Sequence, residues 1–230
     1  HQVSDKISKG VGFLMKKNNI EVFSGHAQIK TKNTLLVEKE SIEFNQLIIA
    51  TGAKYRTFPG LVRDGKRLIG AWDAILMNEV PKSVGIIGAG AIGVEFAYFW
   101  KSFGADVTIY EMQNHLLPIE DEESSIEVEK AYKKMGINLC LGVKNVTAKA
   151  NAKKAVIEFT DAKGDQKHEF DYALIAVGMT GNIEGFGLEA IGVETEKGFI
   201  KVNEFGQTNI SHIYAIGDVT TAEGKKGGGI

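Results

Sequence analysis

Four stretches of the chain are continuously apolar, which is the pattern of strands buried on both faces of a parallel sheet. They are residues 47–50, 84–87, 172–177 and 213–216, and a glycine follows each of them within two residues. A fifth run, 107–110, ends on Glu111. These runs predict buried strands.

Alternating runs elsewhere predict two antiparallel meanders. The first is expected from short runs at 20–23, 27–29, 34–37 and 41–44. The second is expected from strands at 143–148, 155–159 and 168–170, with a turn at 161–164. From residue 187 onward the pattern predicts loops and short strands, and the glycine-rich composition of 223–230 predicts a flexible tail.

Helical spacing of apolar residues predicts a helix over 1–19, and a short helix is expected over 72–78. Another is expected from Asp121 to about Met135, because acidic residues open it, lysines close it and Gly136 follows. A helix over 91–103, ended by Gly104, connects the strands at 84–87 and 107–110.

The strand at 84–87 runs into Gly88, Gly90 and Gly93, which match the pattern G-x-G-x-x-G. The first glycine permits a tight turn, the second lets a pyrophosphate approach the backbone, and the third lets helix and strand pack closely. The helix N-terminus adds free N–H groups and a partial positive charge. Because strand, glycines, helix and second strand occur in register, the pattern predicts a dinucleotide site in an α/β, Rossmann-like domain.

Glu111 stands at the end of the second strand, about 20 residues past the glycines, where a carboxylate can accept hydrogen bonds from both ribose hydroxyls. A 2′-phosphate there would meet this carboxylate, and no arginine follows among residues 112–114. The sequence therefore favours NAD over NADP.

Composition excludes several other classes of function. The chain has 230 residues, 43% of them apolar, and a net charge of −2 from 27 basic and 29 acidic side chains, so no nucleic-acid surface is indicated. No apolar run is long enough to span a membrane. The five histidines show no metal-ligand spacing, so no metal site is expected. Cys140 is the only cysteine and is expected to be a small buried hydrophobe.

Several motifs together resemble the two-dinucleotide flavoprotein disulfide reductases, of the pyridine nucleotide-disulfide oxidoreductase family. The stretch 47–53 (LIIATGA), followed by Pro59-Gly60, resembles their ATG…PG segment, and 213–219 (IYAIGDV) resembles the segment that holds FAD. Within the family, details such as Trp72-Asp73-Ala74 and Leu117-Pro118 are most similar to the dihydrolipoamide dehydrogenases. The resemblance extends from residue 1 to about residue 220.

The resemblance implies an FAD-binding domain interrupted by an NAD-binding domain. Residues 1–70 and 182–222 are expected to belong to the first, and residues 71–181, which contain the second meander, are expected to form the NAD-binding domain.

The resemblance also implies roles for individual residues. The residues that the resemblance places at the FAD are Ala27, Thr51, Gly52 and Asp218, and Asp218 is expected beside the ribityl hydroxyls. Those implied at the NAD are Gly88, Gly90, Ile92, Gly93, Glu95, Glu111, Val146 and Gly178. Among these, Val146 is expected to flank the adenine, and Gly178 and Glu95 to lie toward the nicotinamide.

Some family features are not found. After Gly178 the family commonly has Arg-x-Pro-Asn, whereas this chain has Met179-Thr180-Gly181-Asn182. The first glycine motif for FAD, the redox Cys-x4-Cys pair and the catalytic His-Glu pair are absent from the sequence, so no catalytic residue is assigned. The chain is expected to be an internal fragment that neither retains FAD firmly nor reduces lipoamide by itself.

The parent enzyme implied by the resemblance oxidises dihydrolipoamide through a disulfide and FAD to reduce NAD. It is expected to be a homodimer of the bacterial cytoplasm or mitochondrial matrix, with lipoyl-bearing proteins of 2-oxo acid dehydrogenase complexes as partners, and with no nucleic-acid or membrane partner. Two alternatives stay open: another NADH-dependent flavoprotein reductase of the same fold, or a non-catalytic NAD(H)-binding module.

Overall fold

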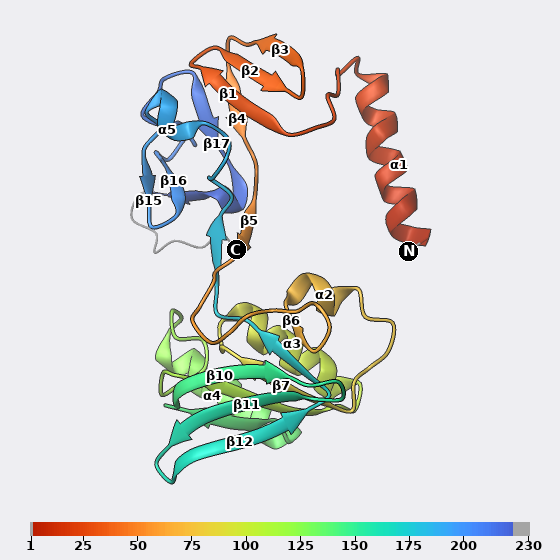
Figure 1. Ribbon diagram of the computed structural model, residues 1–230, viewed down its shortest axis with the longest axis vertical. Helices are drawn as coiled ribbons and strands as arrows, with labels where there is room; N and C mark the ends of the chain where they lie inside the picture. The colour runs from red at the N-terminus through yellow and green to blue at the C-terminus, as the bar shows by residue number, and fades with distance from the viewer. Residues whose placement is uncertain (1, 223–230) are drawn as a thin grey trace. The chain divides into compact units, whose positions relative to one another are not determined.

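The computed structural model describes residues 2–222 (Figure 1). The chain forms two compact units. The central unit is the single segment 54–179, and the terminal unit combines the segment up to Ala53 with the segment from Thr180 onward. The central unit thus interrupts the terminal one in the sequence.

The boundaries of the two units differ from the expected ones at 70/71 and 181/182. Residues 54–70 belong to the central unit because strand β6 (Leu68–Ile69) pairs in parallel with β13 (Tyr172–Ile175). In addition, the Ala148 N–H donates to the Gly60 carbonyl at 3.0 Å. Both interactions join positions about 90 to 100 residues apart, so local patterns could not place the boundary.

A five-stranded parallel sheet forms the centre of the central unit, in the order β6-β13-β7-β8-β9. Its other strands are β7 (Ser83–Ile87), β8 (Asp106–Glu111) and β9 (Asn138–Leu141). The predicted strands at 84–87 and 107–110 are confirmed. The continuous apolar run of β7 is explained by burial, since Val84, Ile86 and Ile87 are all buried.

Three helices accompany this sheet: α2 (Ala71–Ile75), α3 (Ala91–Ser102) and α4 (Glu122–Met135). Ala97 and Trp100 of α3 pack into a core with Val107 and Ile109 of β8. The Tyr132 hydroxyl of α4 donates to the Val94 carbonyl of α3 at 2.7 Å, which joins the two helices.

The ends of α4 follow the predicted signals. Asp121 is the N-cap, and its carboxylate accepts the Ser124 N–H at 3.0 Å. Gly136 closes the helix in the left-handed region, with φ of 77°. Helix α2, by contrast, ends at Ile75, three residues before the predicted end.

An antiparallel meander packs against the same sheet and forms a second core with it. It consists of β10 (Lys144–Ala150), β11 (Ala155–Asp161) and β12 (Gly164–Phe170), and is visible in the lower part of Figure 1. Ile157, Phe159 and Phe170 from the meander pack with Ile87 and Ile175 from the sheet. Strand β12 is four residues longer at its start than predicted, because polar residues pair along its exposed length.

The core of the terminal unit lies around two parallel strands, β4 (Leu47–Ile49) and β17 (Ile213–Ala215). Both strands were predicted, but Ile48 is 62% exposed, so β4 is not buried on both faces. The first meander contains β1 (Ala27–Thr31), β2 (Thr34–Val37) and β3 (Glu40–Glu43). The strand expected at 20–23 is absent from the described structure.

The second segment of the terminal unit contains more regular structure than predicted. Its elements are helix α5 (Leu188–Ile191), strands β15 (Thr195–Glu196), β16 (Phe199–Val202) and β18 (Thr220–Ala222), and the 3-10 turn η1 (Gly217–Val219). Strands β15, β16 and β18 form one sheet. The turn η1 follows β17 directly. Elements this short lie below the length at which periodicity identifies them.

Two further elements complete the described chain. Strands β5 (Ala53–Tyr55) and β14 (Met179–Gly181) form a two-stranded sheet at the points where the chain passes between the units. Helix α1 (Gln2–Lys17) confirms the predicted N-terminal helix, but none of its residues is buried. The predicted flexible tail, 223–230, lies outside the described residues.

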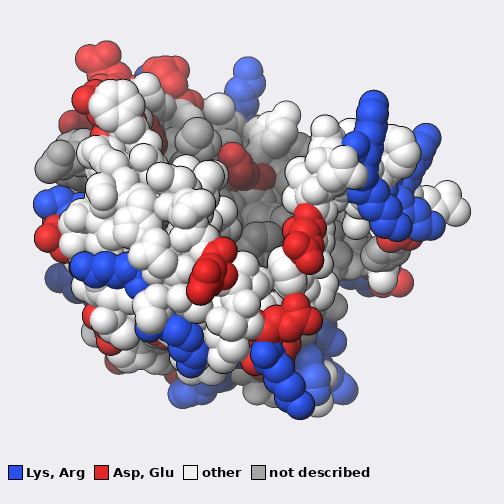
Figure 2. All heavy atoms as spheres, turned by 90° about the horizontal axis from the view of Figure 1, so that it is seen from above, with Lys and Arg blue, Asp and Glu red and all other residues white. Residues whose placement is uncertain are grey.

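On the face that Figure 2 shows, acidic and basic side chains are interspersed with uncharged ones. Among residues 2–222, no helix is long and apolar enough to cross a membrane.

We predict that Gly85→Val destabilises the protein by about 2–3 kcal/mol, because the meander leaves no room for a side chain on β7. A Cβ at Gly85 would lie 2.4 Å from Ile157 Cδ1 and 2.7 Å from the Phe170 ring. Urea denaturation measures the effect. The matched control is Gly12→Val on α1, where a Cβ meets nothing within 4 Å, and equal stabilities of the two variants would contradict the prediction.

A second prediction concerns Asp171, between β12 and β13. The Lys154 ammonium at 2.9 Å, together with the Ser83 and Lys82 amides, holds the pKa of this carboxyl below its usual value despite partial burial. Because the folded-state pKa is lowered, the stabilisation is complete above about pH 4 and is lost as the pH falls through the folded-state pKa.

Asp171→Asn is therefore expected to cost about 1–2 kcal/mol at pH 7 and to flatten the loss of stability below pH 4. Urea denaturation at several pH values measures both effects. Glu158→Gln, which breaks the exposed Lys149–Glu158 pair, is the control and should change stability little. An unchanged acid profile in Asp171→Asn would show that this carboxylate does not contribute.

Candidate functional site

The glycine turn between β7 and α3 forms the base of the candidate site. Gly88 has φ of +101°, and a Cβ there would lie 2.4 Å from the Ala176 carbonyl oxygen. A Cβ on Gly93 would lie 2.0 Å from the Gly88 carbonyl oxygen, so the first turn of α3 packs directly against the loop. Both positions therefore require glycine.

Gly90 differs from these two glycines because its surroundings are open. A Cβ there would meet nothing within 4 Å. Gly90 is also the N-cap of α3, and no side chain caps the helix. The N-terminus of this twelve-residue helix therefore faces unfilled space with free N–H groups and the positive end of its dipole, which suits an anion.

The Glu111 carboxylate is fixed at the end of β8 and is only 8% exposed. One oxygen accepts the Ala89 N–H and the other accepts the Gln113 N–H, both at 2.8 Å. Because a carboxylate oxygen has two lone pairs, each oxygen can still accept a hydroxyl hydrogen. The side chain is thus pre-positioned as a double acceptor beside the glycine turn.

These groups line one cavity of about 350 Å³ in the central unit, within the size range of small-molecule sites. Its walls include Gly88, Ala89, Gly90, Tyr110, Glu111, Met112, Pro118, Ile119, Val146, Val177, Gly178, Arg56 and Phe58. Most of these residues are apolar or glycine. The charged residues of the lining are Glu111 and Arg56, and the backbone adds further polar groups.

Of the eight residues expected at the NAD, five line this cavity: Gly88, Gly90, Glu111, Val146 and Gly178. Gly93 lies beneath it as the packing residue of α3, and Ile92 is half-buried on the same helix outside the lining. Glu95 is exposed and lines a different cavity. The structure therefore brings together five of the residues expected at the NAD, whereas Glu95 lines another cavity.

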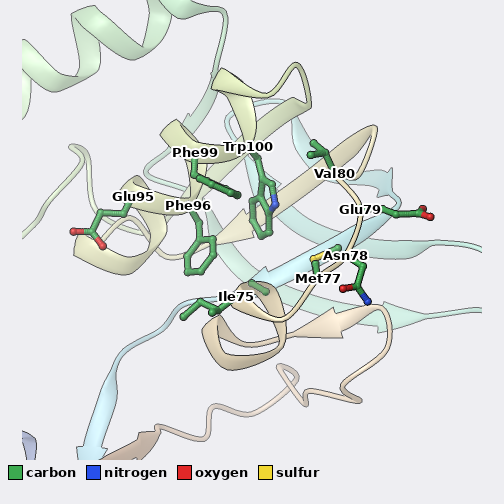
Figure 3. A pocket seen from close by; sticks show the side chains of 10 residues that line it. Ile75, Met77, Asn78, Glu79, Val80, Glu95, Phe96, Phe99 and Trp100 are labelled. Atoms are coloured by element: carbon green, nitrogen blue, oxygen red, sulfur yellow. The ribbon is translucent and has the colours of Figure 1, made fainter. Parts of the chain in front are cut away.

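The cavity beside Glu95 lies between α2 and α3 and measures about 480 Å³. Figure 3 shows Phe96 and Trp100 extending from α3 toward Ile75 and Met77, while Glu95 and Glu79 extend to either side. Its walls are mostly apolar as well, but neither the glycine turn nor Glu111 lines it.

The four residues expected at the FAD lie in the terminal unit. Thr51 and Gly52 follow β4 and Asp218 follows β17, and these strands pair in parallel through Ile49 and Ala215. Their carboxyl ends therefore meet at one sheet edge, the usual ligand position in such folds. Thr51 Oγ1 donates to the Asn182 carbonyl at 2.7 Å, whereas Ala27 begins β1 in a separate sheet.

Burial affects two further side chains of the central unit, Tyr110 in the cavity wall and Cys140, which is half-buried and not fully buried as expected. Burial raises the pKa of Tyr110 above its ordinary value, and its hydroxyl lies 2.5 Å from His168 Nδ1. Burial also raises the pKa of the Cys140 thiol, with a smaller contribution from Asp161, so this cysteine is not activated. Within 2–222, no group of His, Cys, Asp and Glu has the arrangement of a metal site.

Sequence reasoning did not identify Arg56, Phe58, Tyr110 or Ile119 as lining residues. Arg56 and Phe58 were assigned with residues 1–70 to the other domain, so their position could not be inferred. Tyr110 directly precedes Glu111 on the predicted strand, and this neighbourhood was the one signal in the sequence that could have placed Tyr110 at the cavity.

Comparison with known proteins agrees with this geometry. The family model described as pyridine nucleotide-disulphide oxidoreductase matches residues 2–228. The chain belongs to this family. The family's members use NAD and FAD, the two cofactors expected from the sequence.

Curated relatives of this chain include two bacterial proteins named dihydrolipoyl dehydrogenase. The one from Chlorobaculum parvum is 42% identical over 225 residues, covering 95% of this chain and 48% of the relative. The one from Zymomonas mobilis is 39% identical over 228 residues, covering 96% of this chain and 49% of the relative. The chain thus spans about half the length of the curated relatives it matches.

Solved structures show the same fold. LpdA from Mycobacterium tuberculosis superposes with a TM-score of 0.84 at 22% identity, covering 95% of this chain and 50% of that protein. The HOCl-induced flavoprotein disulfide reductase RclA from Escherichia coli gives a TM-score of 0.77 at 26% identity, covering 94% of this chain and 51% of that protein.

Proposed function

We propose that this chain carries the NAD site, and part of the FAD site, of a dihydrolipoyl dehydrogenase. The observation that carries the proposal is the single cavity where Gly90, the uncapped N-terminus of α3 and the buried Glu111 carboxylate converge. The names of the relatives at about 40% identity support the substrate class.

In this proposal the flavin and the nicotinamide supply the hydride chemistry. The residues of the chain bind and orient the nucleotide. Glu111 accepts the adenosine ribose hydroxyls, the amides at the start of α3 bind the pyrophosphate, and Val146 packs on the adenine. Because Ala89 and Gln113 hold the carboxylate in place, little conformational entropy is lost when the ribose binds.

The FAD would be held in part by Thr51, Gly52 and Asp218, at the edge where β4 and β17 end. A carboxylate and a threonine at the carboxyl ends of paired parallel strands fit a polyhydroxylated ligand chain. Ala27 is kept as a further FAD residue of the proposal. No residue of this chain is assigned a catalytic role.

For the whole protein, the proposal includes a homodimer that acts on lipoyl-bearing proteins of 2-oxo acid dehydrogenase complexes, in a bacterial cytoplasm or mitochondrial matrix. A second candidate is another NADH-dependent flavoprotein reductase, favoured by the similarity to RclA at 26% identity. Turnover of NADH with lipoamide by the whole protein would distinguish the two, because only the first candidate requires it.

We predict that the chain binds NAD(H) at least about tenfold more tightly than NADP(H), because a 2′-phosphate would lie against the Glu111 carboxylate. Titration calorimetry with the four nucleotides measures the preference. Glu111→Gln should reduce it, since the amide removes the negative charge at nearly constant size.

The control for this prediction is Glu120→Gln, which removes an exposed carboxylate outside the cavity lining and should leave the preference unchanged. Equal affinities, or tighter binding of NADP(H), would contradict the assignment. Absence of binding to all four nucleotides would contradict the proposed function itself.

A further inference from the structure

Arg56 is the only positively charged side chain that lines the nucleotide cavity, and Glu111 is the only negatively charged one. Arg56 lies beside Gly178, which follows β13, whereas Glu111 ends β8. Because β7 and its glycine turn lie between those strands, the two charges stand on opposite sides of the turn. The cavity is therefore electrostatically asymmetric around its proposed phosphate position.

The backbone of Arg56 is held from both sides. Its N–H donates to the Gly178 carbonyl at 3.0 Å, and its carbonyl accepts a hydrogen bond from Arg63 Nη2, also at 3.0 Å. Its guanidinium, by contrast, makes no hydrogen bond or ion pair with the described residues, and the residue is exposed. A fixed backbone thus presents an unpaired cation to the cavity.

Arg63, which holds this backbone, is itself fixed. Its guanidinium lies over the Tyr55 ring at 4.4 Å from the centroid, and burial lowers its pKa. The Tyr55 hydroxyl accepts the Trp72 N–H, which joins this pair to α2. The segment that carries Arg56 is therefore part of the central unit and does not depend on a ligand for its position.

A dinucleotide brings two negative charges in its pyrophosphate. A helix N-terminus contributes only about half a unit of positive charge, and the Glu111 carboxylate adds an opposing charge in the same cavity. An arginine can supply the missing charge, because its planar guanidinium forms paired hydrogen bonds with phosphate oxygens.

We propose that Arg56 is a binding residue for the dinucleotide pyrophosphate, opposite the N-terminus of α3. This inference rests on the proposed NAD site and adds a side chain that no motif in the sequence indicates. The guanidinium pairs with phosphate oxygens common to NAD⁺, NADH and ADP-ribose, so it contributes to the affinity of all three and does not distinguish the redox states.

Titration calorimetry of the full 230-residue chain with NAD⁺, NADH, ADP-ribose and adenosine tests this inference. Arg56→Met should weaken the binding of NAD⁺, NADH and ADP-ribose by about tenfold each, because a charge-assisted hydrogen bond at an open site is lost. Adenosine, which lacks phosphate, should bind unchanged. Arg56→Lys should recover part of the loss, because it restores the charge without the paired geometry.

Salt dependence gives a second readout. The affinity for ADP-ribose should fall more steeply with ionic strength in the unsubstituted chain than in Arg56→Met, because the variant lacks the ion pair between the guanidinium and the pyrophosphate. Lys66→Met is the matched control: it removes an exposed cation that lies outside this cavity and should change neither the affinities nor the salt dependence.

Three results would overturn the inference. Unchanged affinities in Arg56→Met would show that the guanidinium does not reach the nucleotide. Weaker NADH binding with tighter NAD⁺ binding would place Arg56 at the cationic nicotinamide ring instead. If the unsubstituted chain bound none of the dinucleotides, the proposed function would fail and this inference with it. If it bound them and Arg56→Met bound them equally well, only the inference would be rejected.

Discussion

The contact between the first turn of α3 and the loop after β7 determines the geometry of the nucleotide site. A Cβ on Gly93 would lie 2.0 Å from the Gly88 carbonyl oxygen, well inside van der Waals contact. This approach directs the amides at the start of α3 at the space beside Gly90. It also places the Ala89 N–H at 2.8 Å from the Glu111 carboxylate, so the proposed ribose acceptor and the proposed phosphate donors are fixed by the same turn.

The surrounding packing keeps that turn in place. On one face of the sheet, Ala97 and Trp100 of α3 are buried with Val107 and Ile109. On the other, the meander covers Ile87 and Tyr110 through Ile157, Phe159 and Phe170. Because protein interiors are close-packed, a shift of either layer would be transmitted to the loop. The polar site thus derives its precision from apolar contacts.

The sequence was most informative where function depends on neighbouring residues. Gly88, Gly90, Gly93 and Glu111 lie on consecutive elements of one strand-helix-strand unit, so their spacing alone indicated their roles. Arg56 could not be found in this way. It joins the site because β6 pairs with β13, residues about 100 positions apart, and because its N–H bonds to Gly178. Glu95, which the resemblance places toward the nicotinamide, lines a different cavity from these residues, and its role stays a prediction.

The two cofactor sites of the proposal differ in how the chain builds them. The residues at the NAD cavity all come from the continuous segment 54–179. Those at the proposed FAD edge depend on β4 pairing with β17, across a separation of more than 160 residues. Closing so long a loop costs entropy, but that cost grows only with the logarithm of loop length. The central unit lies within this loop, and β5 and β14, where the chain passes between the units, pair with each other, which brings the ends of the two terminal segments together. Insertion of the central unit into the terminal one is in this way compatible with a stable pairing of distant strands.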